Sequence, residues 1–426
     1  MLSANYIKDN LELIKDRLTK RGFKEMSLLD EVVSINDERK ALQAKKDTLK
    51  QQANLLSKEI GGLYKSGKRE EADKVKNEKI PALNKELSEI GEKHKAVALA
   101  LDEILFKIPN IPHESVPAGV TEQDNEVFKP LEGDLPELPE SSKPHWELAK
   151  EYDIIDFELG VKITGAGFPV YKGQGARLQR ALINFFLDHA TDAGYLEIQP
   201  PHLVNESSAR ATGQLPDKEG QMYYIPEDDL YLIPTGEVPV TNILRDVMLE
   251  EKDLPVKLTG YTPCFRREAG SYGKDVRGLN RVHQFDKVEV VQVVQPSKSY
   301  EVLEEMVAHV ESLLNKLELP YRILRLCGGD LGFTSALTFD FETYSAAQKR
   351  WLEVSSVSNF ETFQANRLKV RYKDADKKTQ LCHTLNGSAL ALARIVATLL
   401  ENNQTDKGIK IPKLLVPYTG FEYITK

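Results

Sequence analysis

Residues that could act together on a nucleotide or an amino acid lie in the middle of the chain: Arg266, Glu268, Phe285, Lys287 and Glu289. Their flanking segments alternate β-branched or aromatic residues with polar ones, which predicts two strands joined by a loop. Residues two apart share a strand face, so these side chains can line one surface. A guanidinium binds phosphate, an aromatic ring stacks on a base, and a carboxylate holds an ammonium group. The same pattern also fits a hairpin with a solvated charged face.

The loop between the two predicted strands is rich in glycine and in basic residues, among them Lys274, Arg277 and Arg281. We expect it to close over a polyphosphate. The chain has no GxxxxGK[ST] motif and no GxGxxG motif after a strand. A bound nucleotide would therefore not use a P-loop or a dinucleotide-binding fold.

Two heptad-like series near the N-terminus predict a pair of long helices. Glycines between them indicate a tight tip, so we expect an antiparallel coiled-coil hairpin. Pro81 predicts a bend, or a new helix start, in the returning helix. We expect His94 to pack in the seam and not to bind a ligand. The outgoing series is Leu28, Ile35, Leu42, Leu49, Leu56 and Leu63, and the returning series is Ile80, Leu83, Leu87, Ile90, Val97, Leu101 and Ile104.

The hairpin is basic although the whole chain is acidic. The formal net charge is −8, yet residues 39–79 contain 12 Lys or Arg against 6 Asp or Glu. An acidic protein does not coat nucleic acid with its whole surface. The local excess favours contact with a phosphate backbone at low sequence specificity, although a solvated helix face would have the same composition.

Proline-rich stretches predict a boundary after the hairpin. We expect two domains, residues 1–108 and 109–426, with a linker at about 109–135. The second domain mixes strand and helix patterns, which predicts an α+β fold with an antiparallel sheet flanked by helices. The expected elements are one helix in 1–26, a helix near 175–193, a strand ending at Thr235–Glu237, a helix at 297–317, strands at 321–326, 337–344 and 348–356, and a helix from about Ser388 to Asn402.

The composition indicates the cellular setting. No run reaches the roughly 18 apolar residues of a membrane span, and the first residues lack the apolar region of a secretory signal. Cys264, Cys327 and Cys382 are widely spaced, with no CxxC pair. We therefore expect neither a disulfide framework nor a zinc site, no membrane partner, and a cytoplasmic location.

Three segments resemble the signature motifs of class II aminoacyl-tRNA synthetases. They are GYLEIQPP at 194–201, FRRE at 265–268 with RVHQF at 281–285, and NGSALALAR at 386–394. The TGE triplet at 235–237, the string RGLNRVHQFDKVE ending at Glu289, and the basic coiled-coil arm are similar to seryl-tRNA synthetases of the bacterial type. The resemblance covers nearly the whole chain.

The resemblance implies a class II catalytic domain preceded by a tRNA-binding arm. It implies that L-serine and ATP form seryl-adenylate with Mg²⁺, that the seryl group passes to the 3′ end of tRNA(Ser), and that the enzyme is a homodimer. We also expect tRNA(Sec) to be an acceptor. Such an attack on an α-phosphate needs positioning and charge neutralisation and no enzyme nucleophile.

The resemblance also implies site residues. Arg266 matches the arginine that grips the α-phosphate and Arg394 the one on the outer phosphate, and these two are the expected catalytic residues. Strict alternation would separate Glu353 from Ser356, so a shared metal requires a bulge or a bridging water. The implied ATP-binding residues are Arg266, Arg267, Glu268, Val282, Phe285, Glu353, Val354, Ser355, Ser356 and Arg394. The implied Mg²⁺ ligands are Glu353 and Ser356. The implied L-serine-binding residues are Thr235, Gly236, Glu237, Glu289, Asn386 and Ser388.

Two other functions remain open at the level of sequence. The chain could be a class II paralogue that loads an amino acid onto a carrier protein, although such a protein has little use for a basic arm. It could also be a non-enzymatic coiled-coil scaffold.

Overall fold

The computed structural model describes residues 1–217, 220–269 and 276–426. The chain forms two compact units, one of residues 1–19 and 23–109 and the other of residues 20–22 and 110–426. Among the described residues, no helix combines the length and the apolar character that crossing a membrane requires.

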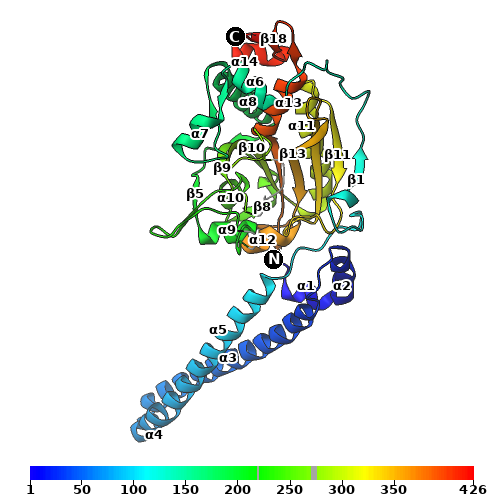
Figure 1. The fold of residues 1–426 in the computed structure, drawn as a ribbon. Helices are drawn as coiled ribbons and strands as arrows, with labels where there is room; N and C mark the ends of the chain where they lie inside the picture. Colours follow the sequence, from blue (N-terminus) through cyan, green and yellow to red (C-terminus); the bar gives the residue numbers. More distant parts are fainter. Residues whose placement is uncertain (218–219, 270–275) are drawn as a thin grey trace. The chain divides into compact units, whose positions relative to one another are not determined.

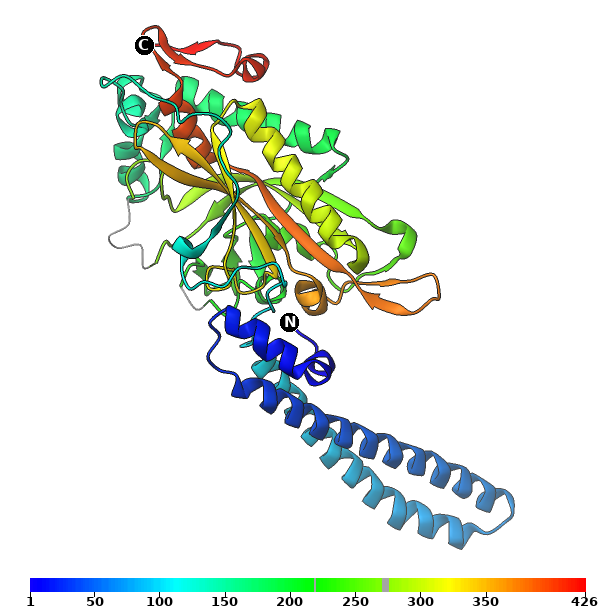
Figure 2. The same ribbon diagram turned by 90° about the vertical axis from the view of Figure 1, so that its right-hand side faces the viewer.

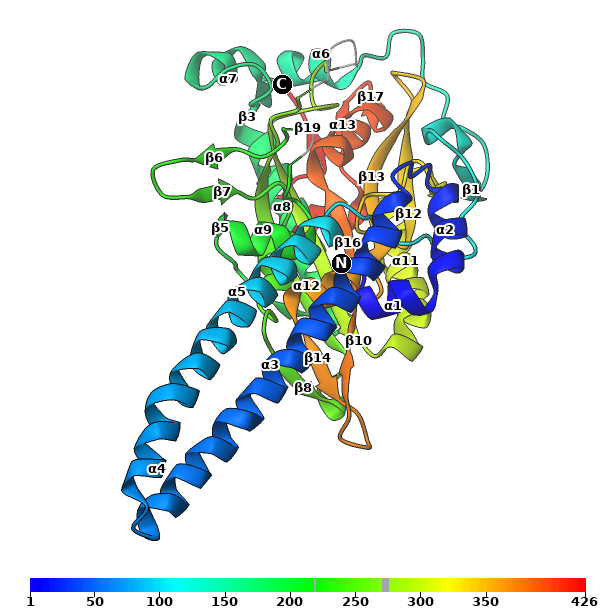
Figure 3. The ribbon, with the colours of Figure 1, turned by 90° about the horizontal axis from the view of Figure 1, so that it is seen from below.

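The first unit is helical, and its two longest helices run side by side as a hairpin (Figures 1 and 3). Residues 66–68 form the turn at the tip, where Gly67 has φ +80°, a conformation that glycine adopts without steric cost. The elements are α1 (Ala4–Asp9), α2 (Leu11–Lys20), α3 (Ser27–Lys65), α4 (Arg69–Lys74), a π-helical turn (Val75–Lys79) and α5 (Ile80–Leu105).

The seam between α3 and α5 is the one that the heptad pattern predicts. Every predicted position is buried or half-buried, and Leu49, Ile90 and Leu101 are at most 7% exposed. His94 also lies half-buried in the seam, and its Nε2 has no hydrogen-bond partner among the described residues. The prediction of an antiparallel helical hairpin is confirmed.

The returning helix accommodates Pro81 by changing from a π-helical turn to an α-helix just before this residue. Proline has no N–H to give to the preceding turn, and its ring crowds the carbonyl four residues earlier. The π-helical turn Val75–Lys79 comes directly before α5, and Pro81 lies in the first turn of α5, where an N–H is not needed. The α-helix therefore begins at Ile80, next to Pro81, which is one of the two outcomes that the sequence allowed.

The prediction of a single helix in residues 1–26 is wrong. The structure has α1 and α2, separated at Asn10, whose backbone φ of −129° is not helical. The Asn10 side chain donates to the carbonyl of Tyr6 at 3.0 Å, so it caps α1 in place of continuing it. Asparagine competes with helical hydrogen bonding in this way.

The second unit is built on an eight-stranded sheet with the order β1-β11-β12-β13-β16-β10-β9-β4. All neighbours pair antiparallel except β4 with β9, which confirms the predicted class of fold. The strands are β1 (Glu126–Lys129), β4 (Leu196–Glu197), β9 (Val256–Phe265), β10 (Gln284–Val294), β11 (Tyr321–Arg325), β12 (Leu337–Ser345), β13 (Arg350–Asn359) and β16 (His383–Ala391).

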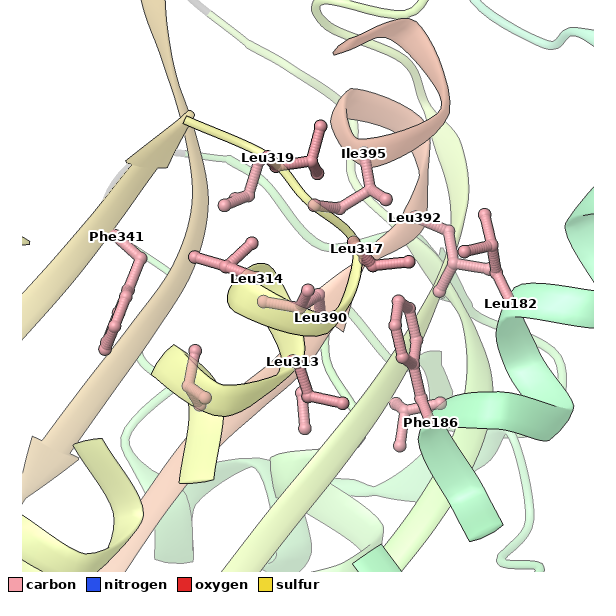
Figure 4. Close-up of a cluster of buried hydrophobic side chains, with 14 of the residues drawn as sticks. Leu182, Phe186, Leu313, Leu314, Leu317, Leu319, Phe341, Leu390, Leu392 and Ile395 are labelled. Atoms are coloured by element: carbon pink, nitrogen blue, oxygen red, sulfur yellow. The ribbon is translucent and has the colours of Figure 1, made fainter. Parts of the chain in front are cut away.

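Three helices cover one face of this sheet and close the main core. Side chains from α8, α11 and α13 meet the sheet residues in one buried apolar cluster, part of which Figure 4 shows around Phe186, Leu314 and Leu392. Figure 2 shows α11 lying along the sheet. The helices of this unit are α6 (His145–Glu151), α7 (Phe157–Ile163), α8 (Gly173–Asp192), α9 (Glu206–Thr212), α10 (Glu237–Asn242), α11 (Ser299–Lys316), α12 (Thr362–Leu368), α13 (Leu392–Asn402) and α14 (Val416–Thr419).

Four small sheets complete the described part of the second unit. Of their strands, β8 and β14 pair parallel and the others antiparallel. They are β2 (Ile155–Asp156) with β3 (Val170–Tyr171); β5 (Leu203–Asn205), β7 (Leu230–Leu232) and β6 (Tyr224–Ile225); β15 (Thr379–Leu381), β14 (Arg371–Lys373) and β8 (Met248–Glu250); and β17 (Gln404–Thr405), β18 (Gly408–Lys410) and β19 (Tyr423–Ile424).

Two local predictions in this unit are wrong. The helix expected from Ser388 begins only at Leu392, because residues up to Ala391 pair with β10 as strand β16, and this pairing overrides the helical preference of the Ala and Leu residues. The strand expected to end at Thr235–Glu237 ends at Leu232. Pro234 has no N–H for a ladder, and Glu237 is the first residue of α10.

Candidate active site

The predicted hairpin is present as β9 and β10, a regular antiparallel pair. Phe285, Lys287 and Glu289 alternate along β10 as predicted. Arg266 lies one residue beyond β9, where its N–H donates to the carbonyl of His283 at 2.9 Å. The Arg266 guanidinium carbon lies 5.2 Å from the centre of the Phe285 ring. The cationic and aromatic groups expected to meet a nucleotide are therefore brought together.

The Arg266 side chain is tied to the segment that precedes α10, since its Nε donates to the carbonyl of Pro234 at 3.2 Å. Glu268 leaves the strand direction at φ +49°, and its carboxylate pairs with Arg281 at 2.5 Å. Its placement on the strand face with Arg266, as predicted, is therefore wrong. Arg267 is exposed, and its N–H donates to the carbonyl of Gln221 at 2.8 Å.

The loop between the strands is described only in part. Lys274 lies outside the described residues. Arg277 packs on Trp146 with 5.4 Å from its guanidinium carbon to the ring, and Arg281 pairs with Glu268. The side chain of Val282 is buried in the main core. Only the main chain of Val282 is thus available to a nucleotide.

A cluster of buried polar side chains, called the polar pocket from here on, lies on the opposite face of the sheet from the main core, between β10, β16, α10 and α12. Gly236, which precedes α10, approaches both β9 and β10, since a Cβ placed on it would lie 3.0 Å from the Thr262 hydroxyl oxygen and 3.3 Å from the Glu289 Cβ. Ser388 pairs with Glu289 in register. Five of the six predicted L-serine residues, with Gly236 the sixth, have side chains at most 8% exposed: Thr235, Glu237, Glu289, Asn386 and Ser388.

Lys287 organises this pocket. Its Nζ donates to the Thr235 hydroxyl at 2.7 Å and pairs with Glu289 Oε2 at 2.9 Å. The Thr235 hydroxyl in turn donates to Glu289 Oε2 at 3.3 Å and accepts the Glu237 N–H at 3.3 Å. The hydroxyl of Thr235 is thus fully used, and Glu289 is fixed from two sides.

Glu237 is the second buried carboxylate. Burial and, next, the nearby Glu289 charge raise the pKa of Glu237 to about 7, against an opposing hydrogen bond from Gln364. Gln364 Nε2 donates to Glu237 Oε1 at 2.6 Å, and Gln364 Oε1 accepts the Thr384 hydroxyl at 2.8 Å. Burial likewise raises the pKa of Glu289, and Lys287 opposes the shift. Two carboxylates facing one ammonium group leave a pocket that suits an added cation.

The strand β13 carries the predicted ATP and metal residues, and it contains the bulge that the sequence required. Its register against β12 shifts between Ser355 and Glu353. Val354 and Val357 both lie in the main core although they are three residues apart, so Glu353 and Ser356 share the other face. The Ser355 hydroxyl donates to the carbonyl of Ser388 at 2.6 Å.

Arg394 lies in the first turn of α13 and reaches the same region. Its Nε donates to the carbonyl of Asn280 at 3.0 Å, and its Nη1 donates to the carbonyl of Glu353 at 2.8 Å. Its guanidinium is therefore held beside both the end of the long loop and β13.

Sequence reasoning missed three residues of this site. Lys287 was placed on the correct face but given no role. Asp340 stands opposite Ser356 on β12; its Oδ1 is buried without a partner among the described residues, and burial with the Glu353 charge raises its pKa well above the ordinary value. A lone Asp in the apolar run LTFDF was the available signal. Gln364 gave no signal, because its role depends on how α12 packs.

The antiparallel sheet, with Arg266 and Phe285 on one hairpin and Arg394 at the start of the following helix, defines a class II aminoacyl-tRNA synthetase domain. Residues 223–403 match the family model described as tRNA synthetase class II core domain (G, H, P, S and T), and residues 1–112 match the Seryl-tRNA synthetase N-terminal domain. The chain belongs to the seryl-tRNA synthetase family.

Similar proteins cover the full length. The chain is 49% identical to the serine–tRNA ligase of Salinibacter ruber, over 100% of this chain and 99% of the relative, and 46% identical to that of Akkermansia muciniphila over the same shares. A seryl-tRNA synthetase from Pyrococcus horikoshii, solved with ATP, is 33% identical with a TM-score of 0.90, over 100% of this chain and 99% of that one. A cytoplasmic serine–tRNA ligase from Naegleria fowleri, solved with AMP, is 28% identical over the same shares, with a TM-score of 0.84.

Proposed function

We propose that this chain activates L-serine with ATP and transfers the seryl group to the 3′ end of tRNA(Ser), and that the pocket around Glu237 and Glu289 is where serine binds. The observation that carries the proposal is the buried set of two carboxylates around Lys287, next to Arg266 and Phe285. A surplus negative charge suits the serine ammonium group. Buried polar partners favour a hydroxylated side chain, since alanine would leave them unpaired.

ATP binds across the hairpin in this proposal. Phe285 offers its ring to the adenine, Arg266 binds the α-phosphate, and Arg394 binds the outer phosphates. Arg266 is held by Pro234 and Arg394 by Asn280 and Glu353, so both cations are oriented before a ligand arrives. Such preorganised charge stabilises a transition state without reorganisation during the reaction.

The first reaction is the attack of the serine carboxylate on the α-phosphorus of ATP. An oxygen–phosphorus bond forms to give seryl-adenylate, and the bond to pyrophosphate breaks. In the second reaction a ribose hydroxyl of the terminal adenosine attacks the seryl carbonyl, and AMP leaves. Neither step needs a covalent bond to the protein; Arg266 and Arg394 supply charge neutralisation and alignment.

The residues on β12 and β13 fit a Mg²⁺ ion. Glu353 and Ser356 share a face because of the bulge, and Asp340 brings a buried carboxylate oxygen without a partner in the described part of the chain. Oxygen ligands, and carboxylates above all, are those that Mg²⁺ prefers. When bound, the ion would add charge neutralisation at the phosphates.

The arm supplies the contact with tRNA in this proposal, and the division into a tRNA-binding domain of residues 1–108 and a catalytic domain of residues 109–426 belongs to it. Ten of the twelve basic residues in 39–79 have exposed side chains, as a contact with the phosphate backbone requires. We extend the acceptor to tRNA(Sec), which carries the same seryl group in this scheme.

A homodimer and a cytoplasmic location complete the proposal. The motif at 194–201 contains the edge strand β4 of the main sheet, and Leu196 on this strand is 63% exposed. Pairing or covering by a second copy would protect such an edge. Light scattering on the purified protein tests the dimer: a single species at about 48 kDa, the mass of one chain, would contradict it.

The deciding experiment is exchange between ATP and pyrophosphate with each of the twenty amino acids and Mg²⁺. We expect exchange with serine alone, followed by charging of tRNA(Ser) transcript. Exchange with another amino acid would mean that the pocket around Glu289 is misassigned. Exchange with serine but charging of a carrier protein in place of tRNA would favour the paralogue, and no exchange at all would favour the scaffold.

A further inference from the structure

A buried, hydrogen-bonded His–Glu pair outside the pocket has no part in the chemistry above. His145, the first residue of α6, and Glu401, in the last turn of α13, are both 0% exposed. His145 Nδ1 and Glu401 Oε1 are 2.6 Å apart. A fully buried carboxylate and imidazole cost desolvation free energy, which must be offset by the contacts that they make.

Those contacts lead to the end of the long loop. The N–H of Leu279 donates to His145 Nε2 at 2.7 Å, which fixes Nε2 as an acceptor and Nδ1 as the donor to Glu401. Gly278 approaches so closely that a Cβ on it would lie 2.2 Å from His145 Nε2, and its φ of +62° is one that glycine adopts freely. The loop segment is therefore shaped to fit His145.

Glu401 also positions Asn280, the residue after Leu279, through Gln348. Its Oε1 accepts Gln348 Nε2 at 2.9 Å, and Gln348 Oε1 accepts the side-chain amide of Asn280 at 2.8 Å. Glu401 Oε2 accepts the Ser345 hydroxyl. Through His145 and through Gln348, the same carboxylate thus fixes two consecutive residues of the loop.

Asn280 is the residue whose carbonyl accepts Arg394 Nε at 3.0 Å. Arg394 and Glu401 are seven residues apart on α13, which is about two turns, so they lie on one face of the helix. One face of α13 is therefore hydrogen-bonded to residues 279–280 at two points. Arg394 makes one bond directly, and Glu401 is linked to the segment through His145 and Gln348.

We propose that the buried His145–Glu401 pair is a positioning unit that holds the Leu279–Asn280 segment so that Arg394 points at the outer phosphates of ATP. This inference rests on the proposed role of Arg394. It assigns a function to α6 and to the C-terminal end of α13, which do not line the serine pocket.

The test compares the affinities for ATP and for AMP, measured by calorimetry on the full-length protein. AMP lacks the outer phosphates, so a misdirected Arg394 weakens ATP alone. For Glu401→Gln we expect the Kd for ATP to rise about tenfold, the equivalent of one lost charge-assisted hydrogen bond, while the Kd for AMP changes less than about twofold. In serine-dependent exchange, the KM for serine should stay within about twofold.

Two substitutions of His145 separate its two contacts. His145→Gln keeps an acceptor near the Nε2 position for Leu279, and His145→Asn keeps only a donor near the Nδ1 position. We expect His145→Asn to weaken ATP binding more. Equal effects of the two variants would contradict the idea that the loop segment is what the pair positions.

Gln348→Ala serves where a buried substitution prevents folding. Gln348 is half-buried, and its removal leaves the His145–Glu401 pair intact while cutting the link to Asn280. We expect a Kd for ATP about threefold higher with an unchanged Kd for AMP. The matched control is Glu311→Gln, which removes a half-buried carboxylate bonded to Lys129 and Tyr321 elsewhere in the unit and should lower stability with no change in the ATP to AMP ratio.

The outcomes are distinguishable. Parallel losses of ATP and AMP affinity, as general loosening would give, overturn the inference. So does wild-type ATP binding in folded Glu401→Gln and Gln348→Ala while Arg394→Ala loses it. If Arg394→Ala itself binds ATP normally, the assignment of Arg394 in the proposed function fails, and this inference fails with it.

Discussion

The serine pocket and the helical arm use the same charged groups in opposite settings. In the pocket, Lys287 and Glu289 form an ion pair with side chains 7% and 2% exposed. On the arm, Lys45 and Glu86 form one at the same 2.9 Å distance with side chains 52% and 46% exposed. Burial makes the first pair a strong determinant of shape and protonation, whereas water screens the second. Two ion pairs with the same 2.9 Å separation thus differ in the free energy of their interaction.

The sharpest way to break this comparison is to remove the arm. Replacing residues 31–104 by a short Gly-Ser linker should lower aminoacylation of tRNA(Ser) by more than about a hundredfold, because the basic contacts with the phosphate backbone are lost. Serine-dependent exchange should stay within about twofold, since the pocket lies wholly in the second unit. Equal loss of both activities would contradict separate roles.

Next to the pocket, Arg266→Ala should have the second largest effect. Loss of one preorganised cation at the α-phosphate is expected to lower the exchange rate by about 10²- to 10³-fold. The measurement is exchange at saturating ATP and serine, with the melting temperature as the control for folding. An unchanged rate in a folded variant would remove Arg266 from the site.

The raised pKa of Glu237 predicts how stability depends on pH. Because its pKa is about 7 when folded, against an ordinary 4.5, the folded protein binds a proton there that the unfolded chain does not. The resulting stability is complete below about pH 4.5 and is lost as the pH rises through about 7. Burial and, next, the Glu289 charge raise this pKa, whereas Gln364 and Lys287 oppose the shift.

Urea unfolding at several pH values checks this sign. Between pH 4.5 and 8, the wild type should lose on the order of 3 kcal/mol relative to Glu237→Gln, which cannot titrate. The control is Glu206→Gln, whose side chain is 46% exposed and which should give no such difference. A wild-type protein that gains stability relative to Glu237→Gln as pH rises would refute the assignment.

The smallest effect is expected on the arm. Lys45→Ala should change the free energy of unfolding by less than about 0.5 kcal/mol, because the pair with Glu86 is exposed. If Lys45 contacts a phosphate, the slope of log affinity for tRNA against log salt should fall by about one. Lys162→Ala, exposed on α7, should leave the slope unchanged, and an unchanged slope in Lys45→Ala would exclude that contact.

The two regions also differ in how far the sequence predicts them. The helical hairpin of the arm is predictable from local periodicity, because each Leu of the seam packs against residues that repeat at the same spacing. Pro81 also predicted the irregular winding of the returning helix. The pairing of β9 with β10 followed from alternation in the same way. These features depend on near neighbours in sequence.

The pocket depends on distant neighbours, and there the sequence was less informative. Ser388 was expected on a helix, but pairing of β16 with Glu289 on β10 makes it a strand residue. Gln364 reaches Glu237 only because α12 packs against α9 and β16. The role of Asp340 needed the register of β12 against β13. Family resemblance supplied the site residues, whereas the hydrogen bonds that orient them required the fold.

The bulge at Val354 reverses the facing pattern of β13 partway along the strand. Before the bulge, one parity of residue number faces the main core, and after it the other parity does. Deleting the extra residue would leave Glu353 and Ser356 two positions apart, and a regular strand would still present both on one face. Making the strand regular without a deletion would instead turn Trp351 and Glu353 to the face opposite Ser356. The extra residue therefore places Glu353 and Ser356, the two proposed Mg²⁺ ligands, on one side of the strand although they are three positions apart. The strand alternates normally on both sides of this residue.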